Sequence, residues 1–326
     1  MKPLAILSLC CAALCLDAAE SATLKLARTI PLPGVKGRFD HFAIDLKSQR
    51  LFVAALGNDT VEVLDLNTGQ RVKSIGGCSK PQGVVYLAES NRLFVANGSD
   101  GTLKVFDGSS YAPLKSLGSM DDADNVRFDE KANVIFVGFG DGALAVIDPS
   151  TVEHASDIKL SGHPESFQLE KHGGRIFVNV PDAKQVAVIG REKKSIVATW
   201  PMKKFQANFP MAFDEASHRL FVGCRKPARL VVLDTETGKP VADLEIPGDT
   251  DDLFFDAKRQ RLYLSCGEGF LDVIQRNGGD RCERIARQPT RGGARTCFYS
   301  PDTDRLYLAV PQRGGQDAEI RVYQPE

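Results

Sequence analysis

The sequence predicts an all-β protein, a seven-bladed β-propeller whose blades are four-stranded antiparallel sheets. Three observations lead to this prediction: an apolar–aromatic–apolar triplet recurs seven times, each copy carries short strand-like runs, and the last copy lacks its fourth run. Repeats of about 40–45 residues with four strands are typical of propeller blades. The triplet aromatics lie 41 to 44 positions apart and are Phe52, Phe94, Phe136, Phe177, Phe221, Tyr263 and Tyr307.

The first repeat shows how each blade is expected to be built. Its four strand-like runs are residues 41–45 (HFAID), 50–56 (RLFVAAL), 60–66 (TVEVLDL) and 71–76 (RVKSIG). Alternating apolar and β-branched residues favour strands, and the intervening NTGQ segment places a glycine where a hairpin turn needs a positive φ. The first run is expected to line the channel and the fourth to form the outer edge.

The two ends of the chain are expected to close the ring. The seventh copy runs from Arg295 to Tyr323 and stops before a fourth strand. Residues 23–34 (TLKLARTIPLPG) are similar to an outer strand such as PVADLEIPG at 240–248. The N-terminal strand is therefore predicted to complete the seventh blade, which removes open sheet edges.

The first 21 residues have the pattern of a secretory signal peptide. Lys2 precedes an uncharged apolar stretch at 4–16, and Ala19-x-Ser21 fits a small-residue cleavage signal. This stretch is too short to span a bilayer. We therefore expect a signal peptide at 1–21, a single propeller domain at 22–326, no membrane span, and a periplasmic or secreted location.

Composition narrows the functional classes. Without Lys2, Asp17 and Glu20, the 41 basic and 42 acidic residues become 40 of each, so nothing indicates a nucleic-acid partner. Five cysteines lie beyond the leader, with no C-x-x-C pair, so zinc and redox motifs are absent. We expect a monomer with no cofactor, and the binding of a divalent cation is left as an alternative.

Several repeats carry a recognisable motif. Residues 50–72 (RLFVAALGNDTVEVLDLNTGQRV), 92–108 and 219–241 resemble the bacterial YVTN β-propeller repeat. The chain as a whole is similar to YncE-like exported seven-bladed proteins. The resemblance implies the fold and supplies no catalytic motif. Related proteins include DNA- or surface-associated members, lactonases and amine dehydrogenase subunits.

The two faces of the predicted ring differ in sequence. Turns on one face are repetitive, as in NTGQ at 67–70 and TETGK at 235–239, whereas the loops around the other mouth differ in every blade. Individual loops on a rigid scaffold point to a binding face. The side chains expected to ring this mouth are Arg38, Asp40, His41, Gln82, Asp124, Asn125, His163, Glu165, Asn208, Asp251, Asp252 and Arg295.

Three interpretations of this acidic ring remain open. It could bind a small polar or cationic ligand, with Phe39, Phe205 or Phe209 as walls. It could hold a divalent cation that activates water, as in lactonase-type hydrolysis. It could also be a structural rim whose carboxylates pair with Arg38, Lys80, Arg225 or Arg295. We expect a binding module for a small molecule or an envelope protein rather than an enzyme, with a metal-dependent hydrolase or a docking scaffold for an envelope or redox partner as alternatives.

Overall fold

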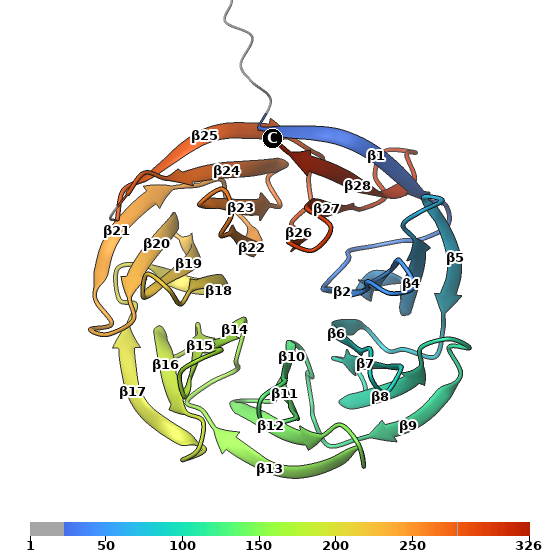
Figure 1. Ribbon diagram of the computed structural model, residues 1–326, viewed down its shortest axis with the longest axis horizontal. Helices are drawn as coiled ribbons and strands as arrows, with labels where there is room; N and C mark the ends of the chain where they lie inside the picture. The colour runs from blue at the N-terminus through green and yellow to red at the C-terminus, as the bar shows by residue number, and fades with distance from the viewer. Residues whose placement is uncertain (1–22, 279) are drawn as a thin grey trace, which may run out of the picture.

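The computed structural model describes residues 23–278 and 280–326, so the expected signal peptide lies outside the described residues. These residues form seven four-stranded antiparallel sheets arranged radially around a channel (Figure 1). The predicted fold class is confirmed. None of the described residues forms a helix long and apolar enough to cross a membrane.

Each blade runs from an inner strand beside the channel to an outer strand (Figure 1). From the inner to the outer strand, blade 1 contains β2 (Phe42–Asp45), β3 (Arg50–Ala55), β4 (Thr60–Asp65) and β5 (Gln70–Ile75), and blade 2 contains β6 (Pro81–Leu87), β7 (Arg92–Asn97), β8 (Thr102–Asp107) and β9 (Pro113–Leu117). Blade 3 contains β10 (Val126–Asp129), β11 (Val134–Phe139), β12 (Ala143–Asp148) and β13 (Glu153–Lys159), blade 4 contains β14 (Phe167–Leu169), β15 (Arg175–Val180), β16 (Gln185–Gly190) and β17 (Ser195–Pro201), and blade 5 contains β18 (Gln206–Asp214), β19 (Arg219–Lys226), β20 (Ala228–Asp234) and β21 (Pro240–Glu245). Blade 6 contains β22 (Thr250–Asp256), β23 (Arg261–Cys266), β24 (Phe270–Arg276) and β25 (Cys282–Pro289), and blade 7 contains β26 (Thr296–Ser300), β27 (Arg305–Val310), β28 (Ala318–Pro325) and β1 (Leu24–Leu32).

Blade 7 joins the two ends of the chain. β1 pairs antiparallel with β28, from Leu24 opposite Pro325 to Leu32 opposite Ala318. Ile30 and Leu32 of β1 are fully buried against Ile320 and against residues of blade 1. The N-terminal strand therefore closes the ring as predicted.

The core lies between neighbouring blades, and strand periodicity explains why. In β3, Leu51 and Val53 pack with blade 7, whereas Phe52 packs with blade 2. Because side chains alternate between the two faces of a strand, a strand covered on both faces becomes a continuous apolar run. The repeated triplet is thus the part of each blade that both neighbours bury. In the first repeat the observed strands differ from the predicted runs by one residue at most at either end, and Leu56 begins a 3₁₀ turn, η1 (Leu56–Asn58).

The five cysteines of the propeller are free thiols. Cys78, Cys224, Cys266 and Cys297 are buried, and Cys282 is partly buried. Burial raises the pKa of each thiol above its ordinary value, so these cysteines are suited to packing rather than to nucleophilic chemistry.

Candidate functional site

A cavity of about 320 Å³ occupies one mouth of the channel. This volume lies at the lower end of the range for small-molecule sites. Eleven of the twelve predicted ring residues border it, together with Asp122, Ser166, Phe209 and Arg225. The eleven are Arg38, Asp40, His41, Gln82, Asp124, Asn125, His163, Glu165, Asp251, Asp252 and Arg295.

A repeated backbone pairing positions these side chains. In blade 1 the Asp40 N–H donates to the Ala54 carbonyl at 2.8 Å, and the Ala54 N–H returns a bond to the His41 carbonyl. The same exchange joins Asp124 and Asn125 to Gly138 in blade 3, and Glu165 and Ser166 to Asn179 in blade 4. Blades 1, 3 and 4 thus share one backbone arrangement at the mouth and differ in the side chains it presents.

Asn208 is the prediction that the structure corrects. Its side chain is fully buried, and its amide donates to Asn179 Oδ1 at 2.8 Å and to the Gln185 carbonyl at 3.0 Å. Asn208 already pairs with Cys224 inside β18, and the register of that strand shifts between Asn208 and Met211. This extension of the strand draws Asn208 into the contact between blades 4 and 5.

The aromatic walls expected for the mouth are mostly elsewhere. Phe39 belongs to the hydrophobic core between blades 7 and 1, and Phe205 packs beside the core between blades 4 and 5. Phe209 does border the cavity, but the Arg225 guanidinium lies 3.8 Å from its ring centroid. The cavity lining is therefore dominated by charged and polar groups.

The arginines of the mouth are already paired. Arg38 donates to Asp40 Oδ2 at 2.9 Å. Arg225 pairs with Asp251, and Arg295 lies 3.3 Å from Asp251 and 2.6 Å from Asp249. Part of the structural-rim interpretation is thus realised, with the exception of Lys80, which forms no side-chain ion pair with any described residue.

Other carboxylates of the mouth lack such partners. Among the described residues, Asp122, Asp124, Glu165 and Asp252 form no ion pair with arginine or lysine, and Glu165 also makes no side-chain hydrogen bond. The lining holds six carboxylates and three guanidinium groups, an excess of three formal negative charges before the histidines are counted. This imbalance is the main electrostatic feature of the mouth.

Burial and mutual repulsion raise the pKa of four carboxyl groups of the mouth. Burial and the neighbouring Asp124 raise the pKa of Asp40 to about 6 and that of Glu165 to about 8. Burial and Asp40 raise the pKa of Asp251 to about 6, and burial together with Asp251 raises that of Asp252 well above its usual value. Both effects disfavour the ionised form, so a cation entering the mouth would be stabilised.

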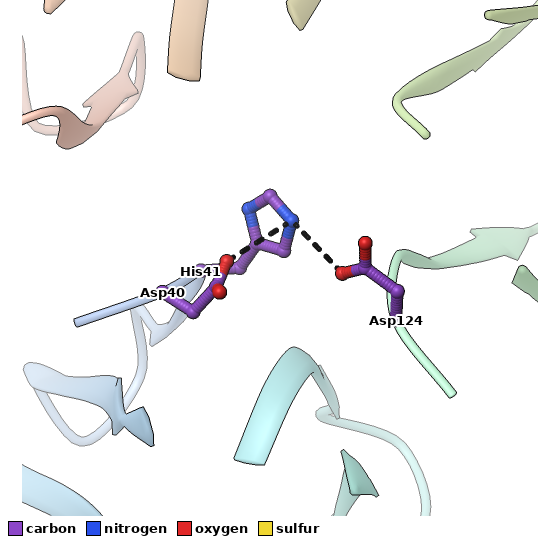
Figure 2. Close-up of side chains that lie close together, drawn as sticks. All are labelled: Asp40, His41 and Asp124. Carbon is purple, nitrogen blue, oxygen red and sulfur yellow. Dashed lines mark ion pairs between the residues drawn. The ribbon is translucent and has the colours of Figure 1, made fainter. Parts of the chain in front are cut away.

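Two histidines lie among the carboxylates. His41 Nε2 is 3.6 Å from Asp40 Oδ1 and 3.8 Å from Asp124 Oδ1 (Figure 2). Burial lowers the pKa of His41, which favours its neutral form. Burial alone would also lower the pKa of His163, but interactions with Asp124 and with the Gly140 carbonyl, 2.7 Å away, raise it to about 9.

A second cavity of about 490 Å³ continues along the channel. His41 and Asp252 border both cavities and so lie where the two meet. Beyond them most lining residues are apolar, such as Phe42, Phe254 and Phe298, and the polar ones are Arg127, Glu130 and Gln168. The polar chemistry of the channel is therefore concentrated at the mouth.

Sequence reasoning missed some lining residues for identifiable reasons. Ser166 immediately precedes β14, so register alone could have included it, whereas Phe209 had been named as a candidate wall of the mouth. Arg225, which was predicted only as a partner of the rim carboxylates, lies near the end of β19 and reaches the mouth from the second strand of its blade. Asp122 belongs to an irregular loop before β10, where no strand register applies.

The comparisons with known proteins support the fold. No family model and no curated protein matches the sequence. A chain in the crystal structure of the mitotic checkpoint complex has a TM-score of 0.77 at 15% identity, covering 99% of this chain and 98% of that one. A chain of Kuenenia stuttgartiensis hydrazine synthase has a TM-score of 0.72 at 16% identity, covering 88% and 99% respectively. At such identities the likeness shows a shared β-propeller architecture.

Proposed function

We propose that the protein is an exported, monomeric binding module that recognises a small polar or cationic ligand at the acidic mouth. One observation carries this proposal: Asp124, Glu165 and Asp252 border the cavity and form no ion pair with an arginine or lysine of the described residues, although the buried Arg127 acts on Asp124 and Asp252 from farther away. Ionised carboxylates removed from water require a compensating charge. A positively charged ligand group would supply it.

The shape of the cavity supports a small ligand. About 320 Å³ accommodates a compact molecule, and polar groups surround it on several blades. Phe209 is covered by Arg225, so little aromatic surface is offered to the ligand. Recognition would therefore depend on charge and hydrogen bonding more than on stacking.

The proposed cellular context comes from the sequence. The apolar leader at 1–21 supports export to the periplasm or beyond, and the repeats at 50–72, 92–108 and 219–241 support assignment to YVTN or YncE-like proteins. Detection of the mature chain in a periplasmic or secreted fraction of the native host tests the first point. Retention of an uncleaved chain in the cytoplasm would contradict it.

Calorimetric titration of metal-free protein with putrescine, choline and L-arginine tests ligand recognition. We expect at least one of these cations to bind, and Glu165→Gln to weaken it by about tenfold, whereas glutamate and phosphate do not bind. Asp148→Asn, a change on the opposite face, is the matched control and should leave binding unchanged. Failure of all three cations, or tighter binding of the anions, would overturn the proposal.

A metal-dependent hydrolase at the same mouth is the second candidate. It is favoured by the approach of Asp40, His41 and Asp124, whose potential ligand atoms lie within 4.8 Å of one another. Hydrolysis of a lactone panel by zinc-loaded protein, lost in Asp124→Asn, would support this activity. An unchanged panel in the presence of bound zinc would eliminate it.

A further inference from the structure

Three side chains at the mouth are arranged for metal coordination. Asp40 and His41 immediately precede β2, and Asp124 precedes β10, two blades away. One potential ligand atom of each residue lies within 4.8 Å of the other two, and His41 Nε2 faces both Asp40 Oδ1 and Asp124 Oδ1 (Figure 2). We infer that Asp40, His41 and Asp124 form a binding site for a divalent first-row transition-metal ion.

The distances between the proposed ligand atoms suit coordination of a shared ion better than hydrogen bonds between the side chains. Donors bonded to a tetrahedral ion at about 2.1 Å would lie about 3.4 Å apart. The two histidine–carboxylate separations of 3.6 and 3.8 Å need to close by only a few tenths of an ångström, and the potential ligand atoms of the two carboxylates lie within 4.8 Å of each other. They are too long for hydrogen bonds.

Another histidine–aspartate pair in the same chain provides a contrast. His154 Nε2 lies 2.6 Å from Asp157 Oδ1, within hydrogen-bond distance. The ring of His41 makes no hydrogen bond to any described residue, although three carboxylates surround it. His41 therefore behaves as a donor group held near carboxylates rather than as a partner already bonded to one.

In each proposed ligand, the second polar atom of the side chain, which would not bind the ion, lies near a different polar group. Arg38 donates to Asp40 Oδ2 at 2.9 Å, and His163 Nε2 lies 4.0 Å from Asp124 Oδ2. His41 Nδ1 lies 3.8 Å from Asp252 Oδ1. Metal ligands are commonly oriented by such outer partners, including a carboxylate behind a histidine. The three inward atoms are thus left free to meet one ion.

A further oxygen at the mouth lacks a partner. Asn125 borders the cavity, its side chain is 3% exposed, and its buried Oδ1 accepts no hydrogen bond. A buried amide oxygen without a partner is unfavourable unless a ligand or water satisfies it. A metal-bound water would provide that donor, so Asn125 is independent support for an occupant.

The mixed donor set indicates the class of ion. Imidazole nitrogen suits zinc, iron, nickel and copper, whereas carboxylate oxygen also suits manganese. Magnesium and calcium prefer sites built entirely from oxygen. Three protein ligands also leave coordination positions open toward the cavity, as in catalytic rather than structural zinc sites.

This inference rests on the proposed role of the mouth as a cation site, and the two can fail separately. Zinc and manganese are titrated into chelator-treated, full-length mature protein, with magnesium as the contrasting ion. We expect about one zinc or manganese ion per chain and at least tenfold weaker binding in Asp124→Asn and in His41→Gln. His154→Gln is the matched control and should bind like the wild type.

Spectroscopy of the wild type keeps the test independent of folding defects in the variants. Pulsed electron paramagnetic resonance of bound manganese should show coupling to an imidazole nitrogen. Absence of zinc and manganese binding, unchanged affinity in folded variants, or manganese without nitrogen coupling would each overturn the metal site. Binding of putrescine or choline to metal-free protein would leave the broader cation-binding proposal standing in that event.

Discussion

Carboxylates at the two ends of the propeller have opposite electrostatic surroundings. On the turn face, Asp65, Asp107, Asp148 and Asp234 accept hydrogen bonds from their own turns, which hold the pKa of each below its usual range. At the mouth, burial and neighbouring carboxylates raise the pKa of Asp40, Glu165, Asp251 and Asp252. The same functional group therefore stabilises the fold at one end and remains available to a ligand at the other.

A single strand displays this contrast. Asp252 lies near the mouth end of β22, and Asp256 is its last residue on the turn face. Asp256 accepts hydrogen bonds from the N–H groups of Lys258 and Arg259 and from Tyr263 Oη. From the described residues the Asp252 carboxylate accepts one hydrogen bond, from the Cys297 N–H at 2.9 Å. Position in the blade, rather than residue type, decides the role of each carboxylate.

The largest expected effect comes from the turn end of this strand. Asp256→Asn should lower the free energy of unfolding by about 2 kcal/mol or more, because it weakens charge-assisted bonds to Arg259 and to the buried Tyr263 hydroxyl. Urea denaturation at neutral pH measures the change. Asp252→Asn, the same substitution on the same strand, should leave stability unchanged or raise it. Equal losses from both substitutions would break the contrast between the two faces.

The next effect concerns Glu165 and depends on pH. Its folded-state pKa of about 8 exceeds the unfolded value, so the folded protein holds an extra proton between these values and loses stability as pH rises through that window. Glu165→Gln should therefore raise the free energy of unfolding by about 1–3 kcal/mol near pH 8. The gain should shrink toward zero near pH 4.

Urea denaturation of metal-free wild type and variant across this pH range provides the measurement. Asp148→Asn is the control on the turn face and should show no such gain at high pH. A Glu165→Gln effect that is independent of pH would indicate a packing change instead of a relieved buried charge.

The smallest stability effect is expected for Arg38. Its side chain is 44% exposed, and exposed ion pairs contribute little, so Arg38→Met should change the free energy of unfolding by less than about 1 kcal/mol. Because Arg38 holds the rear oxygen of Asp40, the same variant should bind zinc about tenfold more weakly. Thermal unfolding and zinc titration on one sample separate the two effects. A large loss of stability with intact zinc affinity would assign Arg38 to the fold.

The fold could be predicted from the sequence because each blade repeats the same pattern of apolar residues and turns. The triplets around Phe52 and Phe94 are buried by both neighbouring blades, and Ile30 and Leu32 had the pattern of the missing outer strand. The mouth was partly accessible because the inner strands share one register. Asn208 does not follow that register, because the pairing of β18 with β19 is irregular there and places the residue in the contact between blades 4 and 5.

The convergence of side chains could not be read from spacing. Asp124 lies close to His41 because blades 1 and 3 are arranged around one axis, and the sequence does not give the distance between them across the ring. Arg225 was expected to pair with a rim carboxylate, but the sequence could not name its partner, Asp251, which it reaches from β19, the second strand of its blade. Distances across the ring, unlike strand positions within a blade, required the structure.

A carbon-13 NMR titration of side-chain carboxyl groups in metal-free protein tests the central contrast most directly. The account predicts that Glu165 titrates at about 8 and Asp40 and Asp251 at about 6, whereas Asp65, Asp107, Asp148 and Asp234 titrate below their usual range. The account would be contradicted if the carboxyl groups of the mouth had ordinary pKa values that did not differ from those of the turn face.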